Sequence, residues 1–192
     1  MKAIFVRHGK DDERYRGGWS QLDLTEEGRV QAKALAARLG ERRGEPAIGR
    51  ILTSDLPRAM TTAQILAREL KLPVQAEPRL REIDNGVLAG MLNETALERY
   101  PGLYFSSLGM DEAYPEGESP NAFYRRIRDW LEDFCREYRD SGENVLIVTH
   151  QGVINIVYHL VRGVPWRNRS KGFPCKPCSM HVLDLETMRM EE

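Results

Sequence analysis

Two short turns carry the residue types that phosphoryl transfer needs. Arg7-His8-Gly9 follows the first apolar run of the chain, and His150-Gln151-Gly152 follows a later one. Arg58 comes just after a third apolar run, near the start of a helical stretch. A neutral imidazole can attack phosphorus and form a phosphohistidine, and the planar guanidinium of arginine matches phosphate oxygens and stays charged. These residues predict a cationic phosphoryl site if the three runs are neighbours in the fold.

The same chemistry needs two further groups. A second histidine can donate hydrogen bonds to the phosphoryl oxygens as charge builds up in the transition state. An acid must protonate the leaving alcohol, and a carboxyl group that faces a phosphate can have a pKa suited to that step. Glu82, at the start of an irregular segment, is the best candidate for this acid.

The elements that must position these groups alternate along the chain. Thr25 is an expected N-cap of the first helix, and Ser54-Asp55 offers a cap for the second. Such alternation predicts an α/β fold, a three-layer α/β/α sandwich with a mostly parallel sheet, whose ligands bind beyond the carboxyl ends of the strands. The expected strands are 3–6, 50–53, 74–76, 144–149 and 180–185, and the expected helices are 26–43, 57–70, 93–99, 120–140 and 152–162.

The segment 81–119 is irregular and rich in glycine and proline, with one short helix expected inside it. A long irregular stretch inside a compact domain usually serves function, often as a lid or substrate wall. We therefore expect a single domain over residues 1–192, with a substrate-covering insertion at about 81–119.

Composition restricts the partners and the compartment. The net charge is −1, which gives no electrostatic case for binding nucleic acid or an anionic membrane. No apolar run is long enough to span a bilayer. The three cysteines form no disulfide framework, so we expect a cytoplasmic protein. The expected partner is a small phosphorylated metabolite, because the predicted site suits a phosphoryl group. A homodimer is an open possibility.

Several other side chains are expected to be structural. Cys175-Lys176-Pro177-Cys178 precedes a late strand and lacks a second cysteine pair, which favours structural cysteines over a redox or metal site. His159 lies among apolar residues of a helix, and His181 lies in the last expected strand. Packing is the expected role of both histidines.

Four ordered blocks of sequence give the chain a family resemblance. It resembles the histidine phosphatase superfamily in its phosphoglycerate-mutase-like branch, over nearly the whole length. One Arg-His-Gly triplet is a weak signal, but four blocks in order at strand ends are a strong one. The blocks are Arg7-His8-Gly9, Ser54-Asp55-Leu56-Pro57-Arg58-Ala59, Leu80-Arg81-Glu82-Ile83-Asp84 and Val148-Thr149-His150-Gln151-Gly152.

The resemblance implies a role for each matched residue. His8 would be the phosphorylated nucleophile and Glu82 the proton donor. The phosphoryl group would be bound by Arg7, Arg58 and His150. The family uses no metal for this chemistry, so we expect no cofactor.

The chain departs from the family pattern on the substrate side of the pocket. Lys10 and Asp11 replace the usual Glu or Gln and Thr or Ser, and Arg14 stands where the family commonly has a phosphate-binding Asn. Lys10 and Arg14 could add positive charge for a second anionic group, whereas Asp11-Asp12-Glu13 could favour a cationic or polyol substrate. The candidate substrate contacts are Lys10, Arg14, Trp19 and Gln151.

Three other functions compete with phosphate ester hydrolysis. A phosphoglycerate-mutase-type transferase would share the same core, although such mutases tend to be longer. A non-catalytic phosphate-binding regulatory module would be expected to lack one of the catalytic residues. A metal-dependent phosphatase would use Asp11, Asp12 and Glu13.

Overall fold

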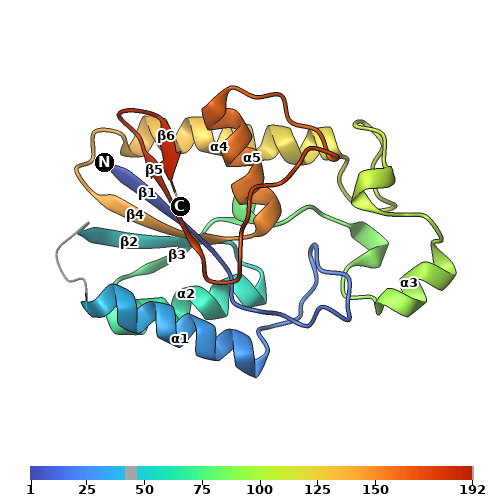
Figure 1. The fold of residues 1–192 in the computed structure, drawn as a ribbon, viewed down its shortest axis with the longest axis horizontal. Helices are drawn as coiled ribbons and strands as arrows, with labels where there is room; N and C mark the ends of the chain where they lie inside the picture. Colours follow the sequence, from blue (N-terminus) through green and yellow to red (C-terminus); the bar gives the residue numbers. More distant parts are fainter. Residues whose placement is uncertain (42–46, 192) are drawn as a thin grey trace.

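The computed structural model describes residues 1–41 and 47–191. Within these residues a six-stranded sheet has the order β3-β2-β4-β1-β5-β6 (Figure 1). The four strands β1 to β4 run parallel, whereas β5 and β6 are antiparallel to their neighbours. The strands are β1 (Lys2–Arg7), β2 (Ile48–Thr53), β3 (Val74–Ala76), β4 (Asn144–Thr149), β5 (Met180–Asp184) and β6 (Arg189–Glu191).

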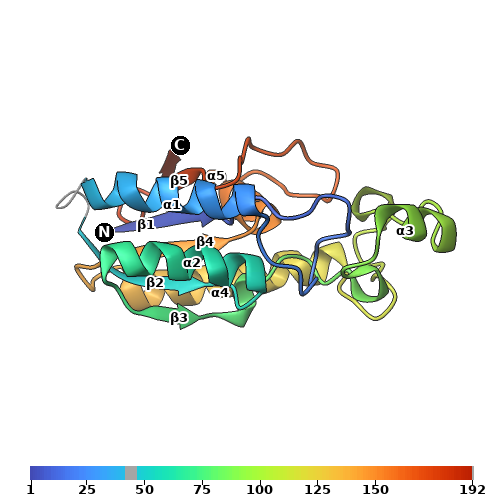
Figure 2. The same ribbon diagram turned by 90° about the horizontal axis from the view of Figure 1, so that it is seen from below.

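Helices cover both faces of the sheet. Helices α1 and α2 pack together on one face, and α4 and α5 lie on the other (Figures 1 and 2). Helix α3 stands apart from both layers, at one end of the molecule (Figure 2). The expected three-layer α/β/α class is therefore confirmed. The helices are α1 (Glu26–Glu41), α2 (Pro57–Leu70), α3 (Asn93–Arg99), α4 (Pro120–Tyr138) and α5 (Gln151–Arg162).

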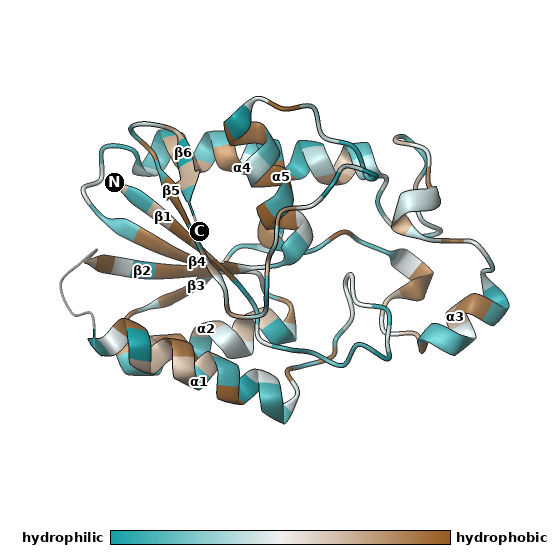
Figure 3. Cartoon of the chain, in the orientation of Figure 1, coloured by the Kyte–Doolittle hydropathy of each residue, from teal (hydrophilic) through white to brown (hydrophobic). Residues whose placement is uncertain are grey.

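The central strands are apolar on both sides because both sides are covered. Phe5 and Ile147 point into the cluster that includes α4 and α5, whereas Val6 and Val148 point into the cluster that includes α1 and α2. Strands β1 and β4 consequently read as continuous apolar runs, as buried parallel strands do. Figure 3 shows these strands as the hydrophobic centre of the molecule.

The N-cap predicted for α1 is present, whereas the one predicted for α2 is not. The Thr25 hydroxyl accepts a hydrogen bond from the Gly28 N–H at 3.1 Å and so caps α1 as expected. The expectation that Ser54 or Asp55 caps α2 is wrong, because the cap position is Leu56 and no side chain caps it. Both side chains have other partners: Ser54 contacts His150 and Asp55 pairs with Arg81.

The last strands of the chain and the end of the first helix differ from, or lie beyond, what can be compared with the predicted pattern. The closing strand expected over 180–185 is β5, and a further short strand, β6, pairs with it after a turn that the sequence did not predict. The expected end of the first helix near residue 43 lies outside the described residues. Among the described residues, no helix is long and apolar enough to cross a membrane.

Candidate active site

The two histidine turns meet because their strands are neighbours. Strand β1 pairs in parallel with β4, and Arg7 lies opposite Thr149 in the register. The next residue of each strand is therefore a histidine, and the ring centroids of His8 and His150 are 5.1 Å apart. Strand β2 flanks β4 on its other side and leads into Arg58. The predicted convergence at the carboxyl ends of three strands is present.

The His8 ring is buried and held in one tautomer. Its Nδ1–H donates to the carbonyl oxygen of Gly9 at 2.7 Å, since a carbonyl can only accept. The Nε2 lone pair is left to accept a hydrogen bond from Nε–H of Arg58 at 3.3 Å. Burial, and then the charge of Arg58, lowers the pKa of His8 well below its ordinary value. The ring is therefore neutral, with its lone pair on Nε2.

His150 has the complementary arrangement. Ser54 is fully buried and its Oγ accepts the Leu56 N–H at 3.3 Å, so its own hydroxyl proton needs an acceptor, and His150 Nε2 lies 2.9 Å away to take that role. Nδ1 then carries the ring proton, and within the described part of the chain this buried atom has no hydrogen-bond partner. Burial, followed by the charge of Arg58, lowers the pKa of His150. The arrangement leaves one donor available for a ligand.

Arg58 supplies a buried positive charge and is 2% exposed. It donates to the carbonyl oxygen of Gly18 at 2.8 Å, and its Nε lies 3.4 Å from a carboxylate oxygen of Asp11. Gly18 has φ +56°, and a Cβ there would lie 1.9 Å from the side-chain oxygen of Asn85. Only glycine can therefore bring this loop carbonyl against Arg58.

Arg7 directly precedes His8, and its charge also acts on the His8 ring. Its Nη1 donates to the carbonyl oxygen of Cys175 at 2.7 Å, which fixes the direction of the guanidinium. Its Nε is buried, and no described residue accepts a hydrogen bond from it. Such an orphaned donor beside a buried histidine is suited to an anion.

Glu82 lies at the N-terminus of α5. Its Oε2 accepts the backbone N–H of Gly152 at 3.0 Å, and its Oε1 accepts that of Ile83 at 3.1 Å. A Cβ at position 152 would lie 2.2 Å from Oε1, so the glycine permits the close approach. The carboxyl group is also near enough to affect the pKa of Arg58 electrostatically. The five predicted core residues thus form one cluster.

An ion pair that the sequence analysis did not select holds the Glu82 backbone. Arg126 of α4 donates from Nη2 to the carbonyl oxygen of Glu82 at 3.0 Å and pairs with Glu118 at 2.8 Å. Glu118 in turn accepts the backbone N–H of Asp84 at 3.0 Å. Glu118 and Arg126 are eight residues apart, which is not a spacing that predicts an ion pair. Both residues also bind the backbone near Glu82, and this contact between distant parts of the chain leaves no local sequence signal.

Tyr114 lies near enough to both Glu82 and Arg16 for each charge to affect its pKa. Burial raises the pKa of Tyr114 to about 12, with Arg16 opposing and Glu82 adding to the shift. The Tyr114 hydroxyl therefore keeps its proton at neutral pH. The Arg16 guanidinium lies 5.0 Å from the ring centre of Tyr104. Both residues bring parts of the 81–119 segment against the loop that follows His8.

The four predicted substrate contacts fall in two places. Trp19 donates from Nε1 to the carbonyl oxygen of Glu82 at 2.8 Å, and Gln151 lines a cavity beside Glu82. Lys10 instead pairs with Glu27 at 2.6 Å, and Arg14 pairs with Asp12 with 77% of its side chain exposed. The first two are close to the predicted acid, and the other two are engaged in surface ion pairs.

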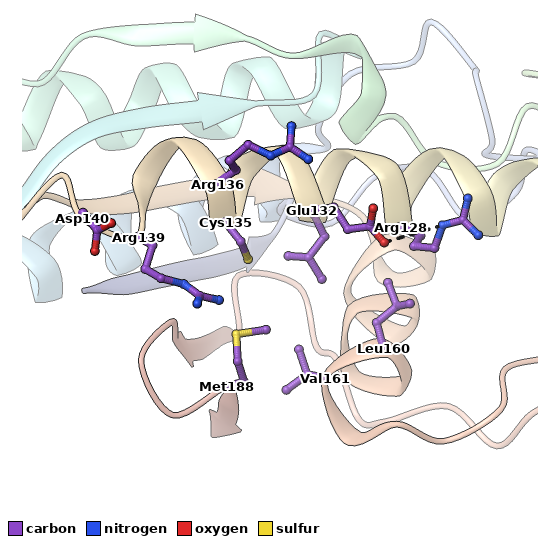
Figure 4. A pocket seen from close by; sticks show the side chains of 10 residues that line it. Arg128, Glu132, Cys135, Arg136, Arg139, Asp140, Leu160, Val161 and Met188 are labelled. Atoms are coloured by element: carbon purple, nitrogen blue, oxygen red, sulfur yellow. Dashed lines mark ion pairs between the residues drawn. The ribbon is translucent and has the colours of Figure 1, made fainter.

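Three cavities differ in their relation to this cluster. A cavity of 420 Å³ begins at Glu82 and Gly152. A second cavity, of 640 Å³, lies between α4, α5 and the turn that carries Met188 (Figure 4), and its lining includes none of the predicted site residues. A third cavity, of 730 Å³, is lined by Lys10, Arg14 and Asp11, and the Asp11 carboxylate lies 3.4 Å from Nε of Arg58. The first and third cavities therefore both adjoin the predicted site, and of the three the first is the one lined by Glu82.

Neither a metal cluster nor a reactive thiol is evident in the described residues. No three His, Cys, Asp or Glu side chains of residues 1–41 and 47–191 could together hold a metal ion. Cys175 and Cys178 are buried, and burial raises the pKa of Cys178 to about 11. The Cys178 thiol is thus a poor nucleophile. The backbone of this turn instead contacts Arg7.

A family model described as histidine phosphatase superfamily (branch 1) matches residues 3–191. The chain belongs to this superfamily. Phosphoserine phosphatase 1 of Hydrogenobacter thermophilus is 30% identical over 194 residues, which cover 98% of this chain and 89% of that protein. A metal-independent phosphoserine phosphatase of Arabidopsis thaliana is 35% identical over 164 residues, which cover 82% and 67%.

A solved structure gives the same result. The mycobacterial glucosyl-3-phosphoglycerate phosphatase matches with a TM-score of 0.77 and 27% identity, over 99% of this chain and 95% of that one. Family, fold and relatives together make the chain a phosphoric monoester hydrolase of the histidine phosphatase superfamily. The family, fold class and phosphatase activity expected from the sequence are confirmed.

Proposed function

We propose that the enzyme hydrolyses phosphate monoesters through a phosphohistidine on Nε2 of His8. The observation that carries this assignment is the neutral, buried His8 ring, whose Nδ1–H is committed to the Gly9 carbonyl oxygen. The lone pair on Nε2 attacks phosphorus, and the bond from phosphorus to the alcohol oxygen breaks. Glu82 gives its proton to that oxygen, so the product leaves as a neutral alcohol.

The second half-reaction restores the enzyme. Water attacks the phosphohistidine, and the Glu82 carboxylate takes its proton. The bond between phosphorus and Nε2 breaks, inorganic phosphate leaves, and both His8 and Glu82 return to their starting states. Water is the final acceptor, which distinguishes this proposal from a mutase.

The remaining residues bind the transferring group. Arg58 stays charged in its buried position, and Arg7 has an uncommitted Nε donor. The unpartnered Nδ1–H of His150 is available for a third contact. Donors fixed in a buried site stabilise the charge that develops on the phosphoryl oxygens without having to reorganise.

Replacing His8 tests the nucleophile. With p-nitrophenyl phosphate, we expect His8→Ala to lower phosphate release by at least about a thousandfold, as loss of a covalent nucleophile commonly does. Acid quenching with a ³²P-labelled ester should give labelled wild-type protein and unlabelled His8→Ala. A folded variant, by circular dichroism, that keeps its label or its activity would show that the nucleophile lies elsewhere.

Two assays address the competing functions. Activity that is unchanged in EDTA would count against a metal site built from Asp11, Asp12 and Glu13. Phosphate release measured beside 3-phosphoglycerate isomerisation separates a phosphatase from a mutase. We expect release without isomerisation, and isomerisation at an equal or higher rate would reject water as the final acceptor.

The proposal includes a small phosphorylated metabolite as substrate and a cytoplasmic location. Two of the similar proteins are named for phosphoserine and one for glucosyl-3-phosphoglycerate. These names support small phosphate esters as the compounds to assay first. The free thiols of Cys135 and Cys178 are compatible with a reducing compartment.

A further inference from the structure

The cavity beside Glu82 lies where the leaving alcohol must extend. Glu82 and Gly152 belong to its lining, whereas the phosphoryl-binding residues His8 and His150 do not. If Glu82 protonates the leaving oxygen, the rest of the alcohol occupies space that adjoins Glu82. The chemistry of this cavity should therefore reflect the chemistry of the alcohol.

The size of the cavity favours a ring over a three-carbon chain. Its volume is 420 Å³, which lies within the roughly 300–1,000 Å³ of pockets that enclose drug-sized ligands. A glycerate or serine group would leave much of this space to water. A sugar ring would contact several walls at once.

One wall is aromatic. Phe105, Phe123 and Trp166 line it, with ring centroids 6.1 and 6.4 Å from that of Trp166, and Tyr124 stacks on Trp166 at 5.5 Å. Phe123 is fully buried, and the lining cation Arg167 is exposed. The Arg126 guanidinium lies 5.1 Å from the centre of the Phe123 ring, but its N–H groups already donate to Glu118 and to backbone carbonyl oxygens. A carboxylate placed deep against Phe123 would therefore lose its hydration without gaining hydrogen bonds from a cation. The flat C–H face of a sugar ring has no such penalty.

The polar part of the lining includes His159, which offers a hydrogen-bond acceptor. His159 is 5% exposed, and its Nδ1–H donates to the carbonyl oxygen of Asn155 at 2.8 Å. In the neutral ring Nε2 is then an acceptor, and it has no hydrogen bond within the described residues. The Asn155 amide is already engaged, because it donates to Gln151 and accepts from Phe173. The His159 ring also packs edge-on against Phe173, with ring centroids 5.3 Å apart, as expected from the sequence.

We infer that this cavity binds the alcohol part of the substrate as a hydroxylated ring, a sugar either free or within a nucleoside. Trp166 and Phe123 lie against the ring, and Nε2 of His159 accepts a hydrogen bond from a ring hydroxyl. This inference rests on the proposed function, since the role of Glu82 fixes which side of the site holds the alcohol.

A panel of esters tests the substrate class. Glucose 6-phosphate, ribose 5-phosphate and adenosine 5′-monophosphate are compared with phosphoserine and 3-phosphoglycerate, and p-nitrophenyl phosphate is the common reference. We expect at least one ring ester to exceed both three-carbon esters in kcat/KM by about tenfold or more. Equal or higher values for either three-carbon ester would overturn the inference. The nucleotide arm decides whether the ring is free or part of a nucleoside.

Variants test the two walls. His159→Phe should lower the ratio of kcat/KM for the best ring ester to that for p-nitrophenyl phosphate by about tenfold, the worth of one buried hydrogen bond. Trp166→Ala should raise KM for the ring ester more than it changes kcat. Leu160→Ala is the matched control, because its side chain lines the remote cavity (Figure 4), and it should leave the ratio unchanged.

The outcomes separate this inference from the proposed function. An unchanged ratio in both wall variants would overturn the inference, and Trp166→Ala keeps the test open if His159→Phe does not fold. If His8-dependent hydrolysis of p-nitrophenyl phosphate persists without ring preference, only the inference fails. If no ester is hydrolysed, the proposed function itself fails.

Discussion

At the scale of single residues, Asp11 is the departure from the family pattern with the clearest electrostatic consequence. Its carboxylate is 21% exposed and lies 3.4 Å from Nε of Arg58, which itself contacts His8. A phosphate dianion must therefore share Arg58 with an existing negative charge. Repulsion between such partly buried charges is worth on the order of 1–2 kcal/mol, so Asp11 should weaken phosphate binding.

We expect Asp11→Ser to lower the inhibition constants of inorganic phosphate and vanadate about tenfold at neutral pH, by the same repulsion. Asp12→Ser is the control, because Asp12 pairs with the exposed Arg14 and not with Arg58. Inhibition constants measured in steady-state assays decide the matter. Weaker inhibition of Asp11→Ser would mean that the carboxylate mainly holds Arg58 in place.

At the scale of elements, the sequence predicted the parts that local patterning controls. Apolar runs predicted β1, β2 and β4, and helical spacing predicted α4, because the burial of one face or both leaves a periodic trace. The short β6 leaves no such trace, since its pairing depends on a turn. The Arg126 contacts and the loss of the Ser54 cap depend on partners distant in sequence. Tertiary contacts of this kind are invisible to local patterning.

The N-terminus of α5 gives the prediction at this scale. A Cβ at position 152 would lie 2.2 Å from Oε1 of Glu82 and 3.1 Å from the buried ring of Phe123, so the carboxyl group would have to move and the ring to shift slightly. Gly152→Ala should therefore change thermal stability only modestly, because the helix preference of alanine opposes this crowding. It should reduce kcat for sugar phosphates by about tenfold to a hundredfold, a part of the roughly 10²–10⁴-fold that a general acid contributes.

The loss should be smaller for p-nitrophenyl phosphate, whose leaving group needs little protonation. Gly17→Ala is the control, since a Cβ there meets no atom within 4 Å. Thermal melts and kcat for both esters give the comparison. Equal losses for the two esters would argue against Glu82 as the acid.

At the scale of the whole molecule, the site was predictable on one condition, that the three strands before the reactive residues are neighbours in the sheet. Parallel strands end at one edge, so residues that follow β1, β2 and β4 converge there. The family resemblance supplied the role of each converging residue. The sequence could not show the burial of His8 and His150, which depends on the packed layers around them.

That burial makes folding stability depend on pH. The pKa values of His8 and His150 are lowered below the ordinary 6.5. Above pH 6.5 both states of the protein are mostly neutral at these positions, so stability is level. Below it the unfolded chain binds protons that the folded chain does not, and the free energy of unfolding falls by up to about 1.4 kcal/mol per pH unit for each histidine.

Urea unfolding at pH 7.5, 6.5 and 5.5 measures this loss of stability. The pKa of Asp12 is lowered to about 2, so protonation of folded Asp12 does not contribute at these pH values. We expect little change over the first interval and a clear loss over the second. His8→Asn removes one of the two titrating rings and should reduce the slope by about half. A free energy of unfolding that stays level to pH 5.5 would mean that these rings accept protons in the folded state, and a neutral nucleophile would then be untenable at that pH.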